Sequence, residues 1–253
     1  MGNAIRYDVK DRIALITLNR PEKRNAINLA MRKELQEAFE DVKYNPDVWV
    51  AILTGEGNTF CSGKDILDTA PEENRGILSN HEIHQYQMHI FKPIICAVNG
   101  GCYAQGCGFA LNSDIVIMSE KASFGWPQGS RGISSVGGPS RGTHVLPWHV
   151  AMGFLMRSKA MTAADCLRWG IATEVVPHED LLPAARRFAE EILECAPLAV
   201  RGMKEAARLG YDLPLEPRMQ LAQFIVERVA LSEDKKEGIQ AFKEKRKPAW
   251  RGR

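Results

Sequence analysis

The chain has 253 residues, enough for one compact domain with an appended element, and its hydrophobic content of 45% and charged content of 25% are typical of a soluble globular protein. A formal net charge of +2 gives no electrostatic basis for a nucleic-acid-binding protein, and no apolar run is long enough to span a bilayer. We therefore expect a cytoplasmic protein with neither nucleic acid nor membrane as a partner.

The first half of the chain alternates between strand-like and helix-like segments. Short apolar runs that end at Gly, Pro or Asn predict strands, and apolar residues at helical spacing predict the helices between them. The predicted strands span residues 13–18, 48–54, 94–98 and 114–118, and the predicted helices span 29–42, 80–91 and 106–112, with Asn28 as the cap of the first. This alternation is typical of an α/β domain with mostly parallel strands.

The second half begins with a Gly- and Pro-rich stretch, residues 125–147, which indicates a functional loop region. Helical patterns follow at residues 150–156, 163–169, 181–195, 197–209, 217–231 and 234–245. We therefore expect an α/β core over residues 1–195 and a helical C-terminal region over residues 196–253. Such a helical region can cover its own core or pack against other subunits, and the pattern is compatible with both.

Several short motifs carry a resemblance to a known family by their order and spacing. They are Asn-Arg-Pro at 19–21 with Asn-Ala at 25–26, then residues 59–65, 92–100, 122–125, 163–165, 169–171 and 242–248. Together they resemble the enoyl-CoA hydratase/isomerase (crotonase) family nearly end to end. The resemblance implies a spiral of β-β-α repeats and a C-terminal helical region that trimerises, so that the protein is expected to form a homotrimer or a dimer of trimers.

By the same resemblance, the substrate is an acyl-CoA thioester, and coenzyme A enters as part of the substrate while no cofactor is bound permanently. The family stabilises a thioester enolate with two backbone N–H groups, and these positions match Lys64 and Gln105. Donors aimed at a developing negative charge are the physical requirement for this chemistry. Gly106 and Gly108 allow the backbone to approach the ligand. The family usually has glycine at the position of Gln105.

The two glutamates of the family's hydratases are both replaced in this chain. Their positions match Gly108, which has no side chain, and Gln128, which cannot exchange a proton at neutral pH. Hydration by the usual pair of carboxylates is therefore not expected, and the reaction class remains open between lyase, isomerase and hydrolase. Gln128 is a candidate to hydrogen-bond the substrate or a water molecule, and a structural role in its loop is the alternative.

His81, His84 and His89 lie on the predicted helix before Pro93, and one of them is the first candidate for the missing base; a water molecule in the pocket is another. His81 matches a histidine of the family's aromatic-CoA dehalogenase, and His84 lies three residues later on the same helix face. His144 is the second candidate, because the family's β-diketone hydrolases use histidines in place of glutamates. A solvated surface residue is the alternative for His81, and a capping or packing residue is the alternative for His144. No carboxylate or cysteine accompanies these histidines at ligand spacing, so no metal site is expected.

The resemblance also implies positions that contact coenzyme A. Lys23 and Arg24 match positions beside the adenine nucleotide, and the basic C-terminal segment matches one that approaches the phosphates, sometimes from a neighbouring subunit. As a solvated chain end, this segment would have no such role. The implied positions are Lys23, Arg24, Ala26, Cys61, Ser62, Asp65, Ile66, Leu67, Phe242 and Lys245.

Two other functions remain open from the sequence. The first is a histidine-dependent retro-Claisen hydrolase of a cyclic β-diketone, which predicts weak binding of coenzyme A. The second is a non-catalytic protein that binds acyl-CoA without turnover.

Overall fold

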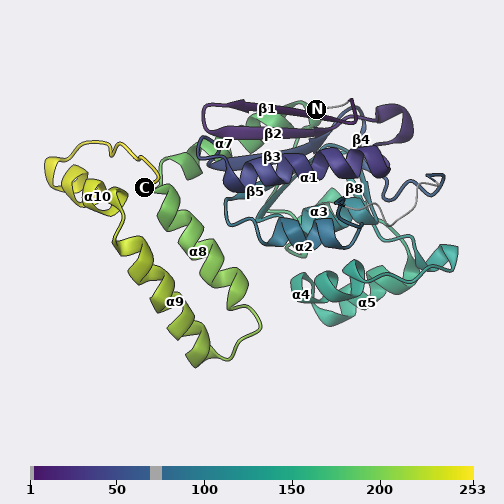
Figure 1. The fold of residues 1–253 in the computed structure, drawn as a ribbon. Helices are drawn as coiled ribbons and strands as arrows, with labels where there is room; N and C mark the ends of the chain where they lie inside the picture. The colour runs from purple at the N-terminus through teal and green to yellow at the C-terminus, as the bar shows by residue number, and fades with distance from the viewer. Residues whose placement is uncertain (1–2, 69–75) are drawn as a thin grey trace.

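A six-stranded sheet forms the centre of the computed structural model, which describes residues 3–68 and 76–253 (Figure 1). The strands follow the order β1-β2-β3-β5-β7-β10; β1 and β2 pair antiparallel and the others pair parallel. Their bounds are β1 Ile5–Lys10, β2 Ile13–Leu18, β3 Val50–Gly55, β5 Ile94–Val98, β7 Ile115–Ser119 and β10 Glu174–Val176. Every residue of β3 and β5 is buried, as expected of parallel strands covered on both faces.

A second sheet of four short strands, in the order β4-β6-β8-β9, lies beside the first. Its strands are β4 Thr59–Cys61, β6 Gly101–Tyr103, β8 Ser123–Gly125 and β9 Met161–Thr162. Each of β4, β6 and β8 directly follows a strand of the first sheet, which confirms the predicted α/β spiral of β-β-α repeats. The turn between β5 and β6 requires glycine, because a Cβ on Gly100 would lie 2.0 Å from the backbone oxygen of Asn58.

The helices agree well with the sequence pattern, although α2 is shorter than expected. Their bounds are α1 Leu29–Tyr44, α2 Glu82–Met88, α3 Gln105–Asn112, α4 Thr143–Val145, α5 Trp148–Arg157, α6 Ala163–Arg168, α7 Leu181–Leu193, α8 Pro197–Leu209, α9 Leu215–Ala230 and α10 Glu233–Glu244. The Asn28 side chain accepts a hydrogen bond of 3.0 Å from Met31 N, as a helix cap should. The Gly-rich region contains a 3-10 turn, Gly129–Arg131, and a π-helical turn, Gly138–Gly142, before α4.

Two hydrophobic clusters cover the two faces of the central sheet. On one face α1 and α3 contribute to the larger cluster, where the rings of Phe39 and Phe109 meet edge to face with centroids 6.2 Å apart. On the other face α7 packs Leu181, Ala185 and neighbouring residues against the sheet. The sheet is therefore a rigid support for α3, whose first residue is one of the two predicted oxyanion positions.

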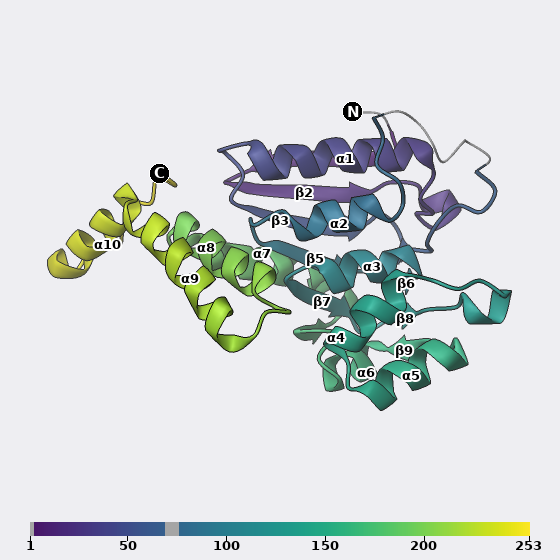
Figure 2. The same ribbon diagram turned by 60° about the horizontal axis from the view of Figure 1, so that its bottom comes forward.

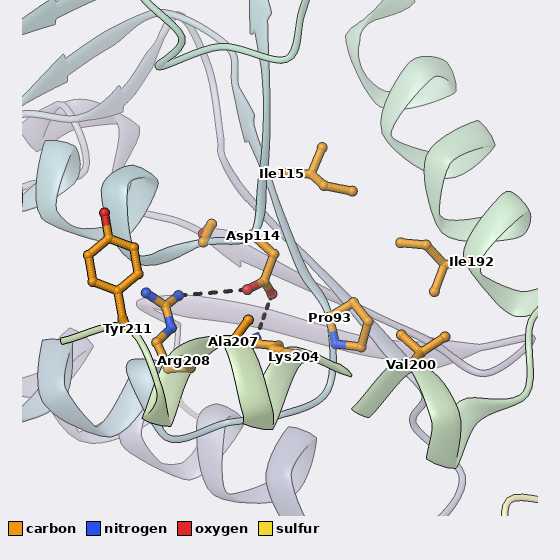
Figure 3. A pocket seen from close by; sticks show the side chains of 10 residues that line it. Pro93, Asp114, Ile115, Ile192, Val200, Lys204, Ala207, Arg208 and Tyr211 are labelled. Carbon is orange, nitrogen blue, oxygen red and sulfur yellow. Dashed lines mark hydrogen bonds and ion pairs between the residues drawn. The ribbon is translucent and has the colours of Figure 1, made fainter. Parts of the chain in front are cut away.

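Helices α8, α9 and α10 extend away from this core as an arm, which both views show (Figures 1 and 2). Lys204 on α8 anchors the arm: its Nζ lies 2.5 Å from Asp114 Oδ2 and 2.8 Å from the backbone oxygen of Lys92. Figure 3 shows Asp114 between Lys204 and Arg208, and its carboxylate also accepts a hydrogen bond of 2.7 Å from Ile94 N. Over the described ranges no helix has the length and apolar content needed to cross a membrane.

Replacing Asp114 with alanine should destabilise the protein by about 3–5 kcal/mol, because a largely buried ammonium loses its charged partner. The backbone N–H of Ile94 loses its acceptor as well. Glu174→Ala is the matched control, since it removes a half-exposed partner of the exposed Arg187 and should change the free energy of unfolding far less. Denaturant unfolding measures both values, and equal losses in the two variants would contradict the anchoring role of Asp114.

Candidate active site

Two loops meet at the N-terminal end of α3. The chain leaves β4 through Gly63 and leaves β6 through Ala104, and a Cβ built on Gly63 would lie 2.8 Å from Ala104 Cβ and 3.6 Å from Gln105 N. Gly63 also has a φ of 104°, so both space and conformation require glycine. Lys64 follows Gly63 directly, and the structure therefore brings the two predicted oxyanion positions, Lys64 and Gln105, onto facing loops.

Backbone hydrogen bonds hold the Lys64 loop in place. Ile27 N donates to Gly63 O at 2.8 Å, Asp65 N donates to Ile27 O at 2.9 Å, and Ile27 and Lys64 form a parallel bridge. The loop is thus part of a short extended pairing, and the orientation of the Lys64 peptide is fixed by its neighbours.

The opposing loop is strained at Ala104, which has φ 53° and ψ −109°, an unfavourable conformation for a residue with a Cβ. Ala104 N donates to Gly125 O at 3.0 Å, and Ala104 O accepts from Gly108 N at 3.2 Å. Gln105 is the first residue of α3, where N–H groups have no acceptor within the helix and the helix dipole is positive. The strained turn therefore directs a helix N-terminus toward the Lys64 loop.

His84 on α2 packs directly against Gly108 on α3. A Cβ built on Gly108 would lie 2.8 Å from His84 Cε1 and 3.0 Å from His84 Nε2, and the imidazole also lies 4.3 Å from the ring of Phe109, centroid to centroid. Burial, reinforced by the nearby charge of His81, lowers the pKa of His84 to about 4. The imidazole is therefore neutral near pH 7 and fills the space into which a side chain at position 108 would extend.

His84 Nδ1 and Gln105 Oε1 are buried at this junction and have no hydrogen-bond partner among the described residues. Gln128 Oε1, at the start of the turn Gly129–Arg131, is buried and unpaired in the same sense. Gln105 also donates a long hydrogen bond of 3.4 Å from Nε2 to Asn80 O. Buried polar groups are normally satisfied, and unsatisfied ones are costly, so the two amide oxygens are well suited to accept from a hydroxyl group or a water molecule.

Most of the predicted coenzyme A positions lie around the same junction. Ser62 N donates to Arg24 O at 3.0 Å. The Arg20 guanidinium donates to Ala26 O at 2.5 Å and to the carboxylate of Asp65 at 3.1 Å. These contacts bring Arg24, Ala26, Ser62 and Asp65 together, and Lys23, Cys61, Ile66 and Leu67 are their direct neighbours along the chain. Lys23 and Arg24 are exposed, as cations that meet phosphates from solvent should be.

The structure does not bring Phe242 and Lys245 to this junction within one chain. Phe242 lies on α10 with 85% of its surface exposed, and Lys245 caps the C-terminal end of the same helix. Figure 1 shows α10 at the end of the arm farthest from β4 and α3. Any contact of these two residues with coenzyme A at this junction therefore requires another copy of the chain.

The two histidines singled out from the sequence lie in different surroundings from His84. His81 is exposed at the start of α2. His144 is also exposed, and its ring stacks on that of Tyr211 with centroids 5.2 Å apart, while its backbone oxygen accepts from the Tyr211 hydroxyl at 3.1 Å. Their proposed roles as bases remain predictions.

The sequence placed His84 among three histidines of one predicted helix but favoured His81 as the base, and it gave no role to Ala104. The only local signal for His84 is that it follows the buried Ile83 on the same helix. The strain at Ala104 had no signal, because alanine ordinarily avoids positive φ. Within residues 3–68 and 76–253 no three His, Cys, Asp or Glu side chains are grouped as metal ligands.

Comparisons with known proteins agree with this fold. The family model described as enoyl-CoA hydratase/isomerase matches residues 8–253. The chain is 34% identical to an (E)-benzylidenesuccinyl-CoA hydratase of Thauera aromatica, over 98% of this chain and 99% of that protein, and 36% identical to a carnitinyl-CoA dehydratase of Proteus mirabilis over the full length of both. A solved enoyl-CoA hydratase/isomerase of Mycobacterium paratuberculosis superimposes with a TM-score of 0.91 at 35% identity, covering 99% of each chain. This chain belongs to the enoyl-CoA hydratase/isomerase family, the crotonase family.

Proposed function

We propose that the protein is an enzyme that binds an acyl-CoA thioester and stabilises its enolate between the backbone N–H groups of Lys64 and Gln105. The observation that carries this proposal is the close approach of the Gly63 loop to the N-terminus of α3. The negative charge that develops on the thioester oxygen would meet two peptide N–H groups and the positive end of a helix dipole.

The reaction class that we favour is addition or removal of water, or a related proton shift, at the acyl group. Supporting this, relatives that match over nearly their whole length bear the names of a CoA-thioester hydratase and a CoA-thioester dehydratase. Gly108 and Gln128 cannot act as a pair of proton-carrying carboxylates. We therefore infer that any such reaction proceeds without the two-carboxylate route.

The unsatisfied acceptors of the site suggest which acyl groups fit. Gln105 Oε1 and Gln128 Oε1 are buried without a described donor, so an acyl group with a hydroxyl, or a water molecule held beside it, would satisfy them. A purely apolar acyl chain would leave both oxygens unpaired, which costs about 1–3 kcal/mol for each. A polar acyl group is therefore the better substrate class.

Coenzyme A itself would enter along the surface near Lys23 and Arg24, whose charges complement the nucleotide phosphates. The arm formed by residues 196–253 carries exposed apolar side chains, including Met219, Phe224 and Phe242. Burial of these side chains against other copies would account for the expected trimer or dimer of trimers, in which α10 of one copy would approach the coenzyme A site of another.

Replacing Gly63 with alanine should reduce kcat/KM by about 10²–10³-fold, because the new Cβ would contact Ala104 and shift the loop that carries one oxyanion donor. Gly170→Ala is the matched control: Gly170 also has a positive φ, but a Cβ there meets no atom within 4 Å. Steady-state kinetics on the two folded variants measures the effect. Equal losses of activity would mean that backbone strain alone, and not the oxyanion hole, explains the result.

The wild-type protein should bind coenzyme A and crotonyl-CoA tightly, as measured by calorimetry, because charged residues and loop backbone converge at the predicted site. Loss of the enoyl absorbance should be much slower than with a hydratase that carries both glutamates. A rate within about tenfold of that hydratase would contradict the altered chemistry. Failure to bind either ligand would favour the cyclic β-diketone hydrolase, and binding without turnover of any acyl-CoA would favour a non-catalytic binding protein.

A further inference from the structure

We propose that the imidazole of His84 is the proton-transfer group of this site. The proposal rests on the proposed function, because the proton that His84 moves is that of a CoA thioester bound at the Lys64–Gln105 junction. His84 comes from α2, a different element from either loop, so its position against α3 is a result of tertiary packing.

The first support is position along α3. Gly108 lies three residues after Gln105, which corresponds to about 4.5 Å along the helix axis at the usual rise per residue. The His84 ring contacts Gly108, since three of its atoms would lie 2.8–3.2 Å from a Cβ at that position. The imidazole is thus less than one helical turn along α3 from the backbone N–H that would hold the thioester oxygen.

The second support is the state of the ring. His84 Nδ1 is buried and has no hydrogen-bond partner among the described residues. An imidazole that served only to hold the structure together would be expected to use its nitrogens in hydrogen bonds. This ring is held by packing on Phe109 and leaves Nδ1 without a hydrogen bond, and it is neutral near pH 7.

The step balances without a further reactant. The Cα–H bond of the bound thioester breaks, and its electron pair forms the carbon–carbon double bond of the enolate while the carbonyl pair moves to the oxygen at the two backbone N–H groups. The proton joins the lone pair of an imidazole nitrogen and gives an imidazolium ion, which is stabilised by the adjacent enolate. Return of a proton from the imidazolium to Cα restores the thioester.

The packing of His84 against Gly108 leaves no room for a second proton-transfer group at position 108. Any Cβ at position 108 would lie within 3.2 Å of the ring, so a carboxylate on that residue and an imidazole at position 84 cannot occupy the space together. The side chains of Gln105 and Gln128 have no proton that they can exchange at neutral pH.

The test is exchange of the α-protons of butyryl-CoA for deuterium in heavy water, followed by mass spectrometry, with binding measured by calorimetry on the same samples. The wild-type protein should catalyse the exchange. His84→Gln should slow it by about 10²-fold or more while butyryl-CoA still binds. His89→Gln is the matched control, because His89 is exposed at the end of the same helix, and it should exchange at the wild-type rate.

Two further variants keep the test decisive if His84→Gln does not fold. Gly108→Ala retains the imidazole but displaces it, and exchange should fall by at least about tenfold. The double variant His84→Ala/Gly108→Glu replaces the imidazole with a carboxylate. It should recover exchange of the α-protons relative to His84→Ala alone.

The outcomes separate this proposal from the function on which it rests. Failure of the wild-type protein to bind butyryl-CoA would overturn the proposed function, and the His84 proposal with it. Binding without exchange in the wild type, or wild-type exchange in His84→Gln or Gly108→Ala, would overturn the role of His84 alone and leave the CoA-thioester site standing.

Discussion

The close approach of two loops at the start of α3 is the constraint on which the rest of the site depends. Parallel pairing of β4 with β6 brings the two loops to the same edge of the second sheet, and glycine at positions 63 and 106 lets them touch. A Cβ on Gly106 would lie 2.7 Å from the backbone oxygen of Cys61, and one on Gly63 would lie 2.8 Å from Ala104 Cβ. The register of two three-residue strands therefore determines how far apart the backbone N–H groups of Lys64 and Gln105 lie.

The packing of His84 against Gly108 shows how a side chain from α2 takes up the space beside one position on α3. Absence of a side chain at position 108 opens space on the helix, and an imidazole from α2 fills it by packing on Phe109. Phe109 in turn contacts Phe39 of α1, so the ring is supported by the main hydrophobic core. Position 108 is thus occupied in space by a neutral imidazole that another element supplies.

Periodicity and capping were enough to predict the long strands and helices, as the Asn28 cap and the buried strand β5 illustrate. The second sheet was not predicted, because strands of two or three residues are too short to show a repeat and are defined by their partners. The resemblance to the family identified Lys64 and Gln105, which the structure brings together. The position of His84 against Gly108 depends on how α2 packs, which no local pattern specifies.

Helix α3 is held at both ends, and this connects the arm to the site. At its C-terminal end Arg141 donates to Leu111 O at 3.0 Å, and Arg208 of α8 donates to Asn112 O at 3.0 Å. These cations satisfy carbonyls that have no partner within the helix and complement the negative end of its dipole. Helix α8, the first helix of the arm, also reaches Asp114 through Lys204. The arm therefore helps to fix the axis of α3. The direction in which α3 presents its N-terminus to the ligand is therefore set partly by the segment through which copies of the chain are expected to meet.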